Sequence, residues 1–356
     1  MSDNSTIEWT DATWNPITGC RVLTPGCTNC YAMKLAGTRL RNHRSRAGLT
    51  IETKAGPVWN GKVRFNEEWL MQPLGWRKPR MIFVCAHGDL FHEDVPDEWI
   101  DKVFAVMALT PQHTYQVLTK RAKRMREYMT TRWAGHHGCR RAEMHASLLA
   151  REMSRDKHFW AEWPLPNVWA GVSTERQQEA NERIPDLLRT PAAVRFISAE
   201  PLLGPIDLED IVTKGDGYED HRSALECDVA VEDDEEFGGA TVSWVIVGGE
   251  SGDGARPMHP DWVRSLRDQC DRAGVPFFFK QWGAWIPFYD RDRDDPDWRN
   301  VPQVDNQMGL GATRFHNLAG GIGFHGERLV AMRNVGKKAA GRVLDRSEYS
   351  EMPRVA

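Results

Sequence analysis

Short apolar runs recur along the chain, and each is followed by a polar cluster and then by residues with helical periodicity. Near-continuous apolar strands that alternate with helices are typical of a parallel sheet covered on both faces. The pattern therefore predicts an α/β fold with parallel strands, arranged as a complete or partial (β/α) TIM-like barrel. A doubly wound open sheet has the same local pattern and remains the alternative. The predicted strands are one near the first cysteines and then residues 80–85, 114–118, 167–172, 194–198, 242–247 and 275–279.

Helical periodicity is clearest over residues 98–109, over a basic segment that runs towards Trp133, over 140–154, after Thr174, and from Pro260 to a stop at Gly274. Polar side chains stand just past the carboxyl end of most predicted strands. In (β/α) barrels that rim carries the active site, so we expect functional residues there.

Two segments depart from this alternation. Residues 206–240 carry thirteen acidic and two basic side chains, a net charge of −11, and we interpret about 209–240 as a mobile acidic surface insertion. Residues 287–356 lack strong periodicity and read as a loosely ordered C-terminal cap. The predicted organisation is thus a catalytic domain over 1–286, containing the insertion, and a C-terminal extension over 287–356.

The net charge of the chain is −4, so everything outside the acidic segment sums to −4 + 11 = +7. Residues 34–80 hold eleven Lys or Arg against three Glu, and residues 120–157 hold eleven against four acidic side chains. Such stretches attract a nucleic acid or nucleotide, or are simply solvated helix faces. No run approaches the roughly eighteen apolar residues of a membrane span, and the N-terminus lacks signal-peptide features, so we expect a cytoplasmic protein without membrane contact.

Three of the seven cysteines, Cys20, Cys27 and Cys30, lie within eleven residues near the start of the chain. Gly19, Pro25 and Gly26 suit a loop that turns sharply. Most iron–sulfur clusters use four cysteines, so a set of three suggests a [4Fe–4S] cluster whose fourth iron binds something other than protein. A zinc site completed by a distant His or Cys is the alternative. An odd cysteine count with no regular spacing argues against a disulfide framework.

The loop Cys27-Thr28-Asn29-Cys30-Tyr31-Ala32 resembles the cluster loop of radical S-adenosylmethionine (SAM) enzymes, although here the first gap is six residues and the aromatic residue, Tyr31, follows the last cysteine. The full set of motifs resembles more closely a group of phage and bacterial proteins, domain of unknown function family 5131, marked by a three-cysteine motif. The matching stretches are the cysteine loop and residues 7–16, 89–92, 118–121, 198–203, 248–251 and 279–283.

The resemblance to radical SAM enzymes implies that the three cysteines hold a [4Fe–4S] cluster and that the fourth iron chelates SAM. Electron transfer from a donor protein would then give a 5′-deoxyadenosyl radical that abstracts hydrogen from substrate. The basic stretches and the phage-type resemblance suggest a nucleic acid or nucleotide as that substrate, and a phage-encoded protein would work in the host cytoplasm.

Further candidate residues follow the predicted strands. Gly248-Gly249-Glu250-Ser251 resembles the Gly-Gly-Glu stretch that receives SAM in radical SAM enzymes, and Glu200 lies in a similar Ser-Ala-Glu-Pro-Leu stretch. We expect Glu200, Glu250, Lys280 and Asp89 as catalytic side chains, and Tyr31, Lys120 and residues 248–251 as cofactor-binding ones. The alternative for the glycines is a turn alone, and the alternative for the lysines is a salt bridge with Glu200 or Glu250. His87 and His92 are candidates for proton transfer or for a further metal ligand.

Two other functions remain open. The first is a zinc-stabilised nucleic-acid-binding or processing protein without radical chemistry. The second is a non-catalytic subunit whose acidic insertion docks a partner protein.

Overall fold

The computed structural model describes residues 5, 7–134, 143–214, 219–226, 240–290, 313–322 and 326–354. The chain divides into two compact units, which are described separately. Unit 1 comprises 1–172, 183–196 and 233–240, and unit 2 comprises 173–182, 197–232 and 241–356.

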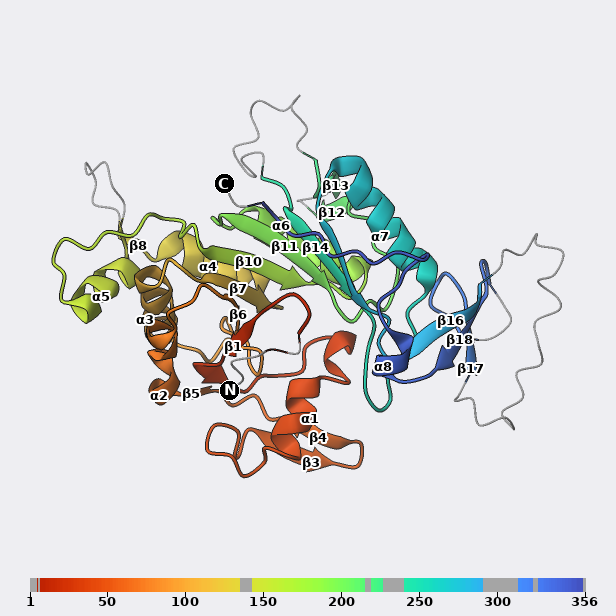
Figure 1. The fold of residues 1–356 in the computed structure, drawn as a ribbon, viewed down its shortest axis with the longest axis horizontal. Helices are drawn as coiled ribbons and strands as arrows, with labels where there is room; N and C mark the ends of the chain where they lie inside the picture. The colour runs from red at the N-terminus through yellow and green to blue at the C-terminus, as the bar shows by residue number, and fades with distance from the viewer. Residues whose placement is uncertain are drawn as a thin grey trace. The chain divides into compact units, whose positions relative to one another are not determined.

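The main sheet has seven strands, and their order in the sheet is the order in which they occur in the chain (Figure 1). The pairs β1–β6, β6–β7, β7–β10 and β14–β15 are all parallel. A doubly wound sheet reverses its strand order part-way, whereas successive addition on one side is the order of a barrel. The strands are β1 (Ala12–Trp14), β6 (Met81–Val84), β7 (Thr114–Thr119), β10 (Val168–Ser173), β11 (Val194–Ala199), β14 (Trp244–Gly248) and β15 (Phe277–Gln281).

In the part of the chain that the structure describes, β1 and β15 are the end strands and do not pair with each other. The fold is therefore a partial (β/α) barrel, which confirms the predicted α/β class and excludes a closed barrel of these strands. All the strands predicted from apolar runs are present. Every residue of β10 and β14 is buried, as expected for strands covered on both faces.

Helices follow most of the sheet strands at the predicted places. The α-helices are α1 (Tyr31–Gly37), α2 (Glu67–Leu70), α3 (Asp97–Leu109), α4 (Ala122–Thr131), α5 (His145–Ser154), α6 (Gln177–Leu188), α7 (Pro260–Ala273) and α8 (Lys337–Ala340), with 3₁₀ turns η1 (Pro25–Cys27) and η2 (Gln72–Gly75). Helix α7 ends where expected, because Gly274 adopts a left-handed conformation with φ of 65°. None of the described helices has the length and apolar character needed to cross a membrane.

Unit 1 contains an N-terminal subdomain that was not predicted in detail. Strand β2 (Ile17–Thr18) pairs with β5 (Arg64–Phe65), and β3 (Thr50–Thr53) forms a hairpin with β4 (Gly56–Trp59). The buried side chains Ala32, Met33 and Ala36 of α1 pack with Leu49 and Trp59, and Cys20 and Cys30 contact this cluster. A short hairpin of β8 (Trp133–Ala134) and β9 (Glu143–Met144) precedes α5.

The C-terminal extension, expected to be loosely ordered, contains regular structure in its described part. Strand β18 (Val330–Asn334) lies between β16 (Trp285–Asp290) and β17 (Thr313–His316) in an antiparallel sheet, and its first three residues are buried. Further on, the Trp244 Nε1–H group donates to the Glu351 carbonyl at 2.8 Å. Loose order is therefore not confirmed for residues 326–354, because their apolar side chains and backbone groups join the core of unit 2.

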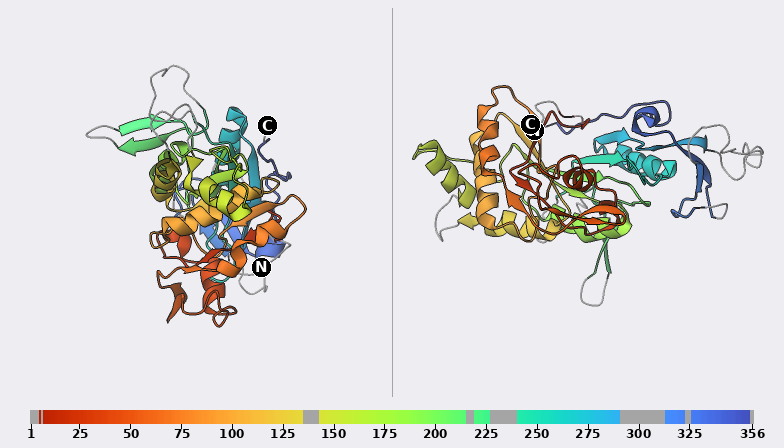
Figure 2. Two further views of the ribbon diagram at one scale, coloured as in Figure 1. Left: turned by 90° about the vertical axis from the view of Figure 1, so that its left-hand side faces the viewer. Right: turned by 90° about the horizontal axis from the view of Figure 1, so that it is seen from below.

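The acidic insertion is only partly described. Strands β12 (Ile211–Lys214) and β13 (Glu219–Arg222) form an antiparallel hairpin that the sequence did not predict. This hairpin extends from unit 2 as a two-stranded green arm in both views of Figure 2. Residues 215–218 and 227–239 lie outside the described residues, so the expectation of a mobile acidic segment is not tested there.

Candidate functional site

The three clustered cysteines lie on one loop of unit 1, between β2 and α1. Gly19 opens this loop with φ of 97°, and a Cβ atom there would stand 2.2 Å from the Lys62 carbonyl oxygen, so only glycine fits. Pro25 begins the turn η1, which ends at the buried Cys27, and Cys30 is the residue immediately before α1. All three cysteines are free thiols.

The cysteine loop is fastened to the carboxyl end of strand β6. Gly19 forms a parallel bridge with Gly88, and its N–H group donates to the His87 carbonyl at 3.1 Å. From the other side of the loop, the Tyr31 hydroxyl donates to the Ala86 carbonyl at 2.8 Å. The cysteine loop therefore lies at the carboxyl end of β6.

The surroundings of Cys20 and Cys30 disfavour the charged thiolate form. Burial and, after it, the charge of nearby Asp89 raise the pKa of Cys20 to about 12, against an opposing effect of Arg121. Burial likewise raises the pKa of Cys30. Cys27 acts electrostatically on both Cys20 and Cys30, so it is close to each of them. Metal binding at this loop would have to displace protons from the thiols.

A single metal ion has no ready-made site here. Among the described residues, no three His, Cys, Asp or Glu side chains are grouped so as to hold one ion. Zinc requires its donors to converge within about 2.3 Å of one point, so the present arrangement of the loop does not fit it. A [4Fe–4S] cluster makes a different demand, because each cysteine binds its own iron at a separate corner of the cube. Three neighbouring free thiols on one loop are compatible with that donor set.

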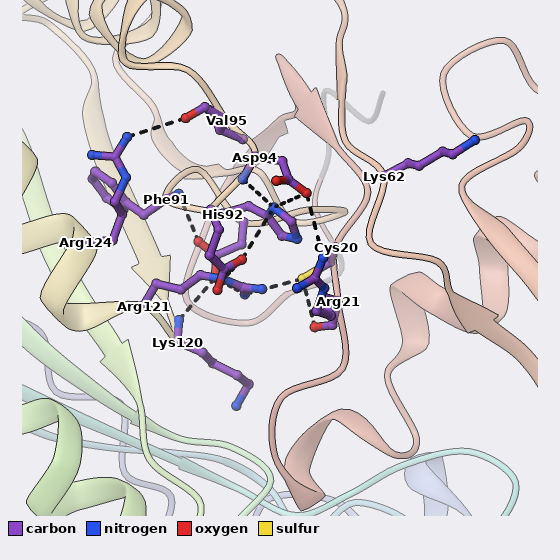
Figure 3. A network of polar contacts seen from close by, with 12 residues as sticks. Cys20, Arg21, Lys62, Phe91, His92, Asp94, Val95, Lys120, Arg121 and Arg124 are labelled. Atoms are coloured by element: carbon purple, nitrogen blue, oxygen red, sulfur yellow. Dashed lines mark hydrogen bonds and ion pairs between the residues drawn. The ribbon is translucent and has the colours of Figure 1, made fainter.

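Asp89, in the segment that follows β6, is buried and accepts several hydrogen bonds. Its Oδ1 accepts from the Thr119 hydroxyl at 2.7 Å, and its Oδ2 accepts from Arg121 Nη1 at 3.0 Å and from the Lys120 N–H group at 3.2 Å. Asp89 therefore connects the segment that follows β6 to the end of β7. Lys120 contributes its backbone to this network, while its side chain extends in another direction from that of Arg121 (Figure 3).

Arg121 connects this network to the cysteine loop. Its Nη1 donates to Cys20 Sγ at 3.5 Å, and its Nε donates to both carboxylate oxygens of Glu93 at 3.2 Å. Burial opposes the charged form of Arg121, but Asp89, Cys20 and Glu93 together raise its pKa. The guanidinium is thus a permanent cation that lies against a candidate ligand sulfur.

The two candidate histidines of unit 1 are neutral. Burial, followed by the charge of Arg46, lowers the pKa of His87 to about 3. Burial, followed by the charge of Arg121, lowers the pKa of His92, whose Nδ1 accepts from the Asp94 N–H group at 3.1 Å. Near neutral pH neither ring is in the charged imidazolium form, so neither acts as a general acid from that form. Each neutral ring keeps one nitrogen without a hydrogen, which can accept a proton.

Glu200 and Lys280, from unit 2, form an ion pair. Lys280 Nζ lies 2.9 Å from Glu200 Oε1, and the side chains are 17% and 14% exposed. The Ser198 hydroxyl donates to the other oxygen at 3.2 Å. A Cβ atom on Gly248 would stand 2.4 Å from Glu200 Oε1, so the glycine leaves the space in which this carboxylate sits. The structure thus brings together three residues predicted from separate motifs.

Glu250 is held by a residue that the sequence did not single out. Arg256 donates from its backbone N–H and from Nε to Glu250 Oε2, both at 2.9 Å, and from Nη2 to Oε1 at 2.6 Å. The preceding Gly249 approaches the Trp282 carbonyl so closely that a Cβ atom would stand 2.0 Å from its oxygen. Backbone packing therefore accounts for this glycine, and Ser251 follows in the same loop, half-buried.

Comparison with models of protein families identifies the family to which the chain belongs. A family model described as "Protein of unknown function (DUF5131)" matches residues 4–353. The chain belongs to this family. The family membership expected from the motifs is therefore confirmed. No curated protein and no solved structure matches the chain.

The structure of this DUF5131 member also shows where its basic residues lie. In the second basic stretch, several arginines form ion pairs within unit 1, namely Arg121 with Asp89, Arg124 with Asp97, Arg126 with Asp186 and Arg132 with Asp101. In the first stretch, by contrast, many cations are exposed: Arg39, Arg41, Arg44, Lys54, Lys62, Arg77 and Lys78. One of these exposed cations, Arg44, pairs with Glu68 at 3.2 Å.

Proposed function

We propose that this protein is a radical SAM-type iron–sulfur enzyme. The observation that carries the proposal is the presence of three free thiols on one loop at the carboxyl end of a strand in a partial (β/α) barrel. When bound and reduced, a [4Fe–4S] cluster with SAM on its fourth iron supplies a 5′-deoxyadenosyl radical for hydrogen abstraction.

The residues around the loop support this role by what they offer the cluster. Cys20, Cys27 and Cys30 would provide the thiolates, and Arg121 places a buried positive charge against one of these sulfurs. On this loop Cys27 is buried and Cys20 and Cys30 are half-buried, whereas the segment 21–23 between them is exposed. Within unit 2, Glu200 and Lys280 form an ion pair and remain candidate catalytic residues, and the loop 248–251 remains a candidate for cofactor binding.

We propose a nucleotide or nucleic acid as the substrate class. Support comes from the exposed cations of residues 34–80 and from the resemblance to phage proteins. Binding of a single-stranded oligonucleotide should weaken steeply as salt is raised, because neutralised phosphates release counterions. Equal affinity at low and high salt would remove this part of the proposal.

The cluster is tested by anaerobic reconstitution with iron and sulfide, followed by iron and sulfide analysis and an assay for 5′-deoxyadenosine with dithionite. Wild type should bind four irons per chain and form 5′-deoxyadenosine. Cys30→Ala should lose both, whereas Cys270→Ala, at a free cysteine buried on α7, should keep both.

Other outcomes of the reconstitution experiment would support different assignments. One zinc per chain without sulfide would support the zinc-stabilised alternative instead. Iron and sulfide without 5′-deoxyadenosine would retain the cluster and remove the SAM chemistry. A wild-type protein that binds neither metal would refute both assignments.

A further inference from the structure

Arg46 of the N-terminal subdomain is a buried cation with no ion-pair partner in the part of the chain that the structure describes. The residue is only 4% exposed. Among the described residues, no carboxylate forms an ion pair with it, and the groups that act on it electrostatically are Tyr31, Cys85 and Arg64. Buried charges in proteins are normally paired, because removal of an ion from water is costly.

Neither Tyr31 nor Cys85 replaces the missing anion. The Tyr31 hydroxyl donates its hydrogen to the Ala86 carbonyl, so it is a neutral phenol. Burial raises the pKa of Cys85 to about 12, so its thiol is uncharged near neutral pH. The third group, Arg64, is a second cation that donates through Nη2 to the Ala47 carbonyl at 2.8 Å. The local field is therefore positive and uncompensated.

The guanidinium itself has an unused edge. Arg46 Nη1 donates to the Ser45 hydroxyl, which is fixed by His43 Nδ1 at 2.7 Å. In the part of the chain that the structure describes, neither Nε nor Nη2 has a hydrogen-bond partner, and Nε is buried. These two N–H groups point along one side of the fork, the side that binds two oxygens of a carboxylate or phosphate.

Neighbouring groups hold the Arg46 side chain in place, although its charge has no ion-pair partner among the described residues. The Arg46 guanidinium carbon lies 5.8 Å from the centre of the Trp69 ring. The Ser45 carbonyl accepts from the Thr18 hydroxyl at 2.7 Å, which joins this turn to the residues just before the cysteine loop. The Arg46 guanidinium is therefore already oriented to bind an anion, which lowers the entropic cost of binding.

We propose that Arg46 binds the carboxylate or phosphate group of a small anionic ligand through its Nε and Nη2 groups. The site lies in the N-terminal subdomain beside Tyr31, the residue after Cys30. Both anion types present two oxygens at the spacing of the fork, so the shared chemistry defines the ligand class. The proposal does not require a cluster on the cysteine loop and stands or falls separately from the proposed function.

The test measures the binding of inorganic phosphate by its ³¹P line broadening, with acetate as competitor, and the thermal midpoint in each anion against chloride at equal ionic strength. Wild type should bind at least one of the two anions saturably and unfold at a higher temperature in it. Binding of phosphate alone, of acetate alone, or of both in competition would identify the anion type that the site accepts.

Arg46→Met should weaken this binding by roughly tenfold to a hundredfold, the worth of a charge-assisted pair of hydrogen bonds. Arg46→Lys keeps the charge but not the fork, so it should fold and bind more weakly than wild type. Arg41→Met, at an exposed residue of the same subdomain, is the matched control and should bind as wild type. The proposal is overturned if wild type binds neither anion, or if both Arg46 variants bind as tightly as wild type.

Discussion

Arg121 donates to Cys20 Sγ at 3.5 Å with the same Nη1 group that lies 3.0 Å from Asp89 Oδ2. One buried guanidinium thus connects the cysteine loop to the ends of β6 and β7. The motif over residues 118–121 contains Lys120, which the sequence predicts as a cofactor-binding residue. In the structure, Arg121 satisfies a buried aspartate and lies against a candidate ligand.

Removal of Arg121 should therefore destabilise the protein even without any cofactor. In Arg121→Met, Asp89 would remain as a buried charge without its partner, and loss of one member of a buried ion pair costs about 3–5 kcal/mol. The Arg121 and Asp89 side chains are only 5% and 6% exposed, so solvent offers little compensation. Urea unfolding of the apoprotein measures the free energy directly.

Arg124→Met is the matched control, because Arg124 pairs with Asp97 where both side chains are about a third exposed. Exposed pairs contribute roughly 1 kcal/mol or less. Equal free energies of unfolding for the two variants would show that burial does not distinguish them.

A second prediction concerns Gly248, the residue whose missing side chain makes room for Glu200. In Gly248→Ala, a Cβ atom would lie 2.4 Å from Glu200 Oε1, so the carboxylate must leave its place beside Lys280. Overpacking of this kind costs about 1–3 kcal/mol. The free energy of unfolding should fall by that amount, and a crystal structure should show Glu200 displaced.

Gly75→Ala provides the comparison. No atom lies within 4 Å of the Cβ position at Gly75, and its φ is not in the left-handed region. This substitution should be neutral or slightly stabilising, because alanine restricts the unfolded chain. A Gly248→Ala protein as stable as Gly75→Ala would contradict the steric account of the Gly-Gly-Glu stretch.

A third prediction concerns acid stability through Asp345, which accepts hydrogen bonds from Arg264 and Arg267. The hydrogen bond from Arg264 lowers the pKa of Asp345 below its usual 3.8, against the opposing effect of burial. A carboxylate with a depressed pKa in the folded state stabilises the protein above its unfolded pKa. That contribution is lost as the pH falls through the folded pKa.

Asp345→Asn should therefore be less stable than wild type near pH 7, by about 1 kcal/mol at most since the carboxylate is partly exposed. The difference should shrink as the pH falls from about 4. Urea unfolding at several pH values measures it, with Asp271→Asn on the exposed face of α7 as the control. A difference that stays constant down to low pH would rule out this ion-pair explanation.

The sequence predicted the sheet well because parallel strands that are buried on both faces consist of nearly continuous apolar residues. The predicted 242–247 and 275–279 differ from β14 and β15 only at their ends. The β12–β13 hairpin was missed because all residues of β13 are polar and exposed or half-buried, so no apolar alternation marks that strand. Strand β18 was missed because its partners β16 and β17 are distant in the chain, and such pairing leaves no local signal.

The candidate site was predictable in its residue types but not in its pairings. The position of Asp89 after a buried strand indicated a functional or structural carboxylate at the rim, and it lies there. Nothing in the spacing indicated that Arg256 would hold Glu250, because the two are joined by an irregular loop. Arg46 was also inaccessible to sequence reasoning, since its interest lies in the absence of a nearby anion among the described residues.

The last prediction concerns the end of the chain, which supplies partners for two sheet strands. The Phe279 N–H group of β15 donates to the Tyr349 carbonyl at 3.1 Å, and the Phe277 N–H group donates to Glu351 Oε2 at 2.9 Å. The Trp244 indole of β14 donates to the Glu351 carbonyl. A chain that stops after Glu348 would leave these donors without partners, and each unsatisfied buried group costs about 1–3 kcal/mol.

Such a truncated protein should unfold at markedly lower urea concentration and exchange the amide hydrogens of Phe277 and Phe279 faster than wild type. A chain that ends at Arg354 retains all three hydrogen bonds and should match wild type in both measurements. If the two truncated proteins were equally stable, the C-terminal residues would be dispensable to the sheet, and the original expectation of a loose cap would stand. Asp345 and its pairs with Arg264 and Arg267 remain in both chains, so the comparison isolates the contacts of residues 349–351.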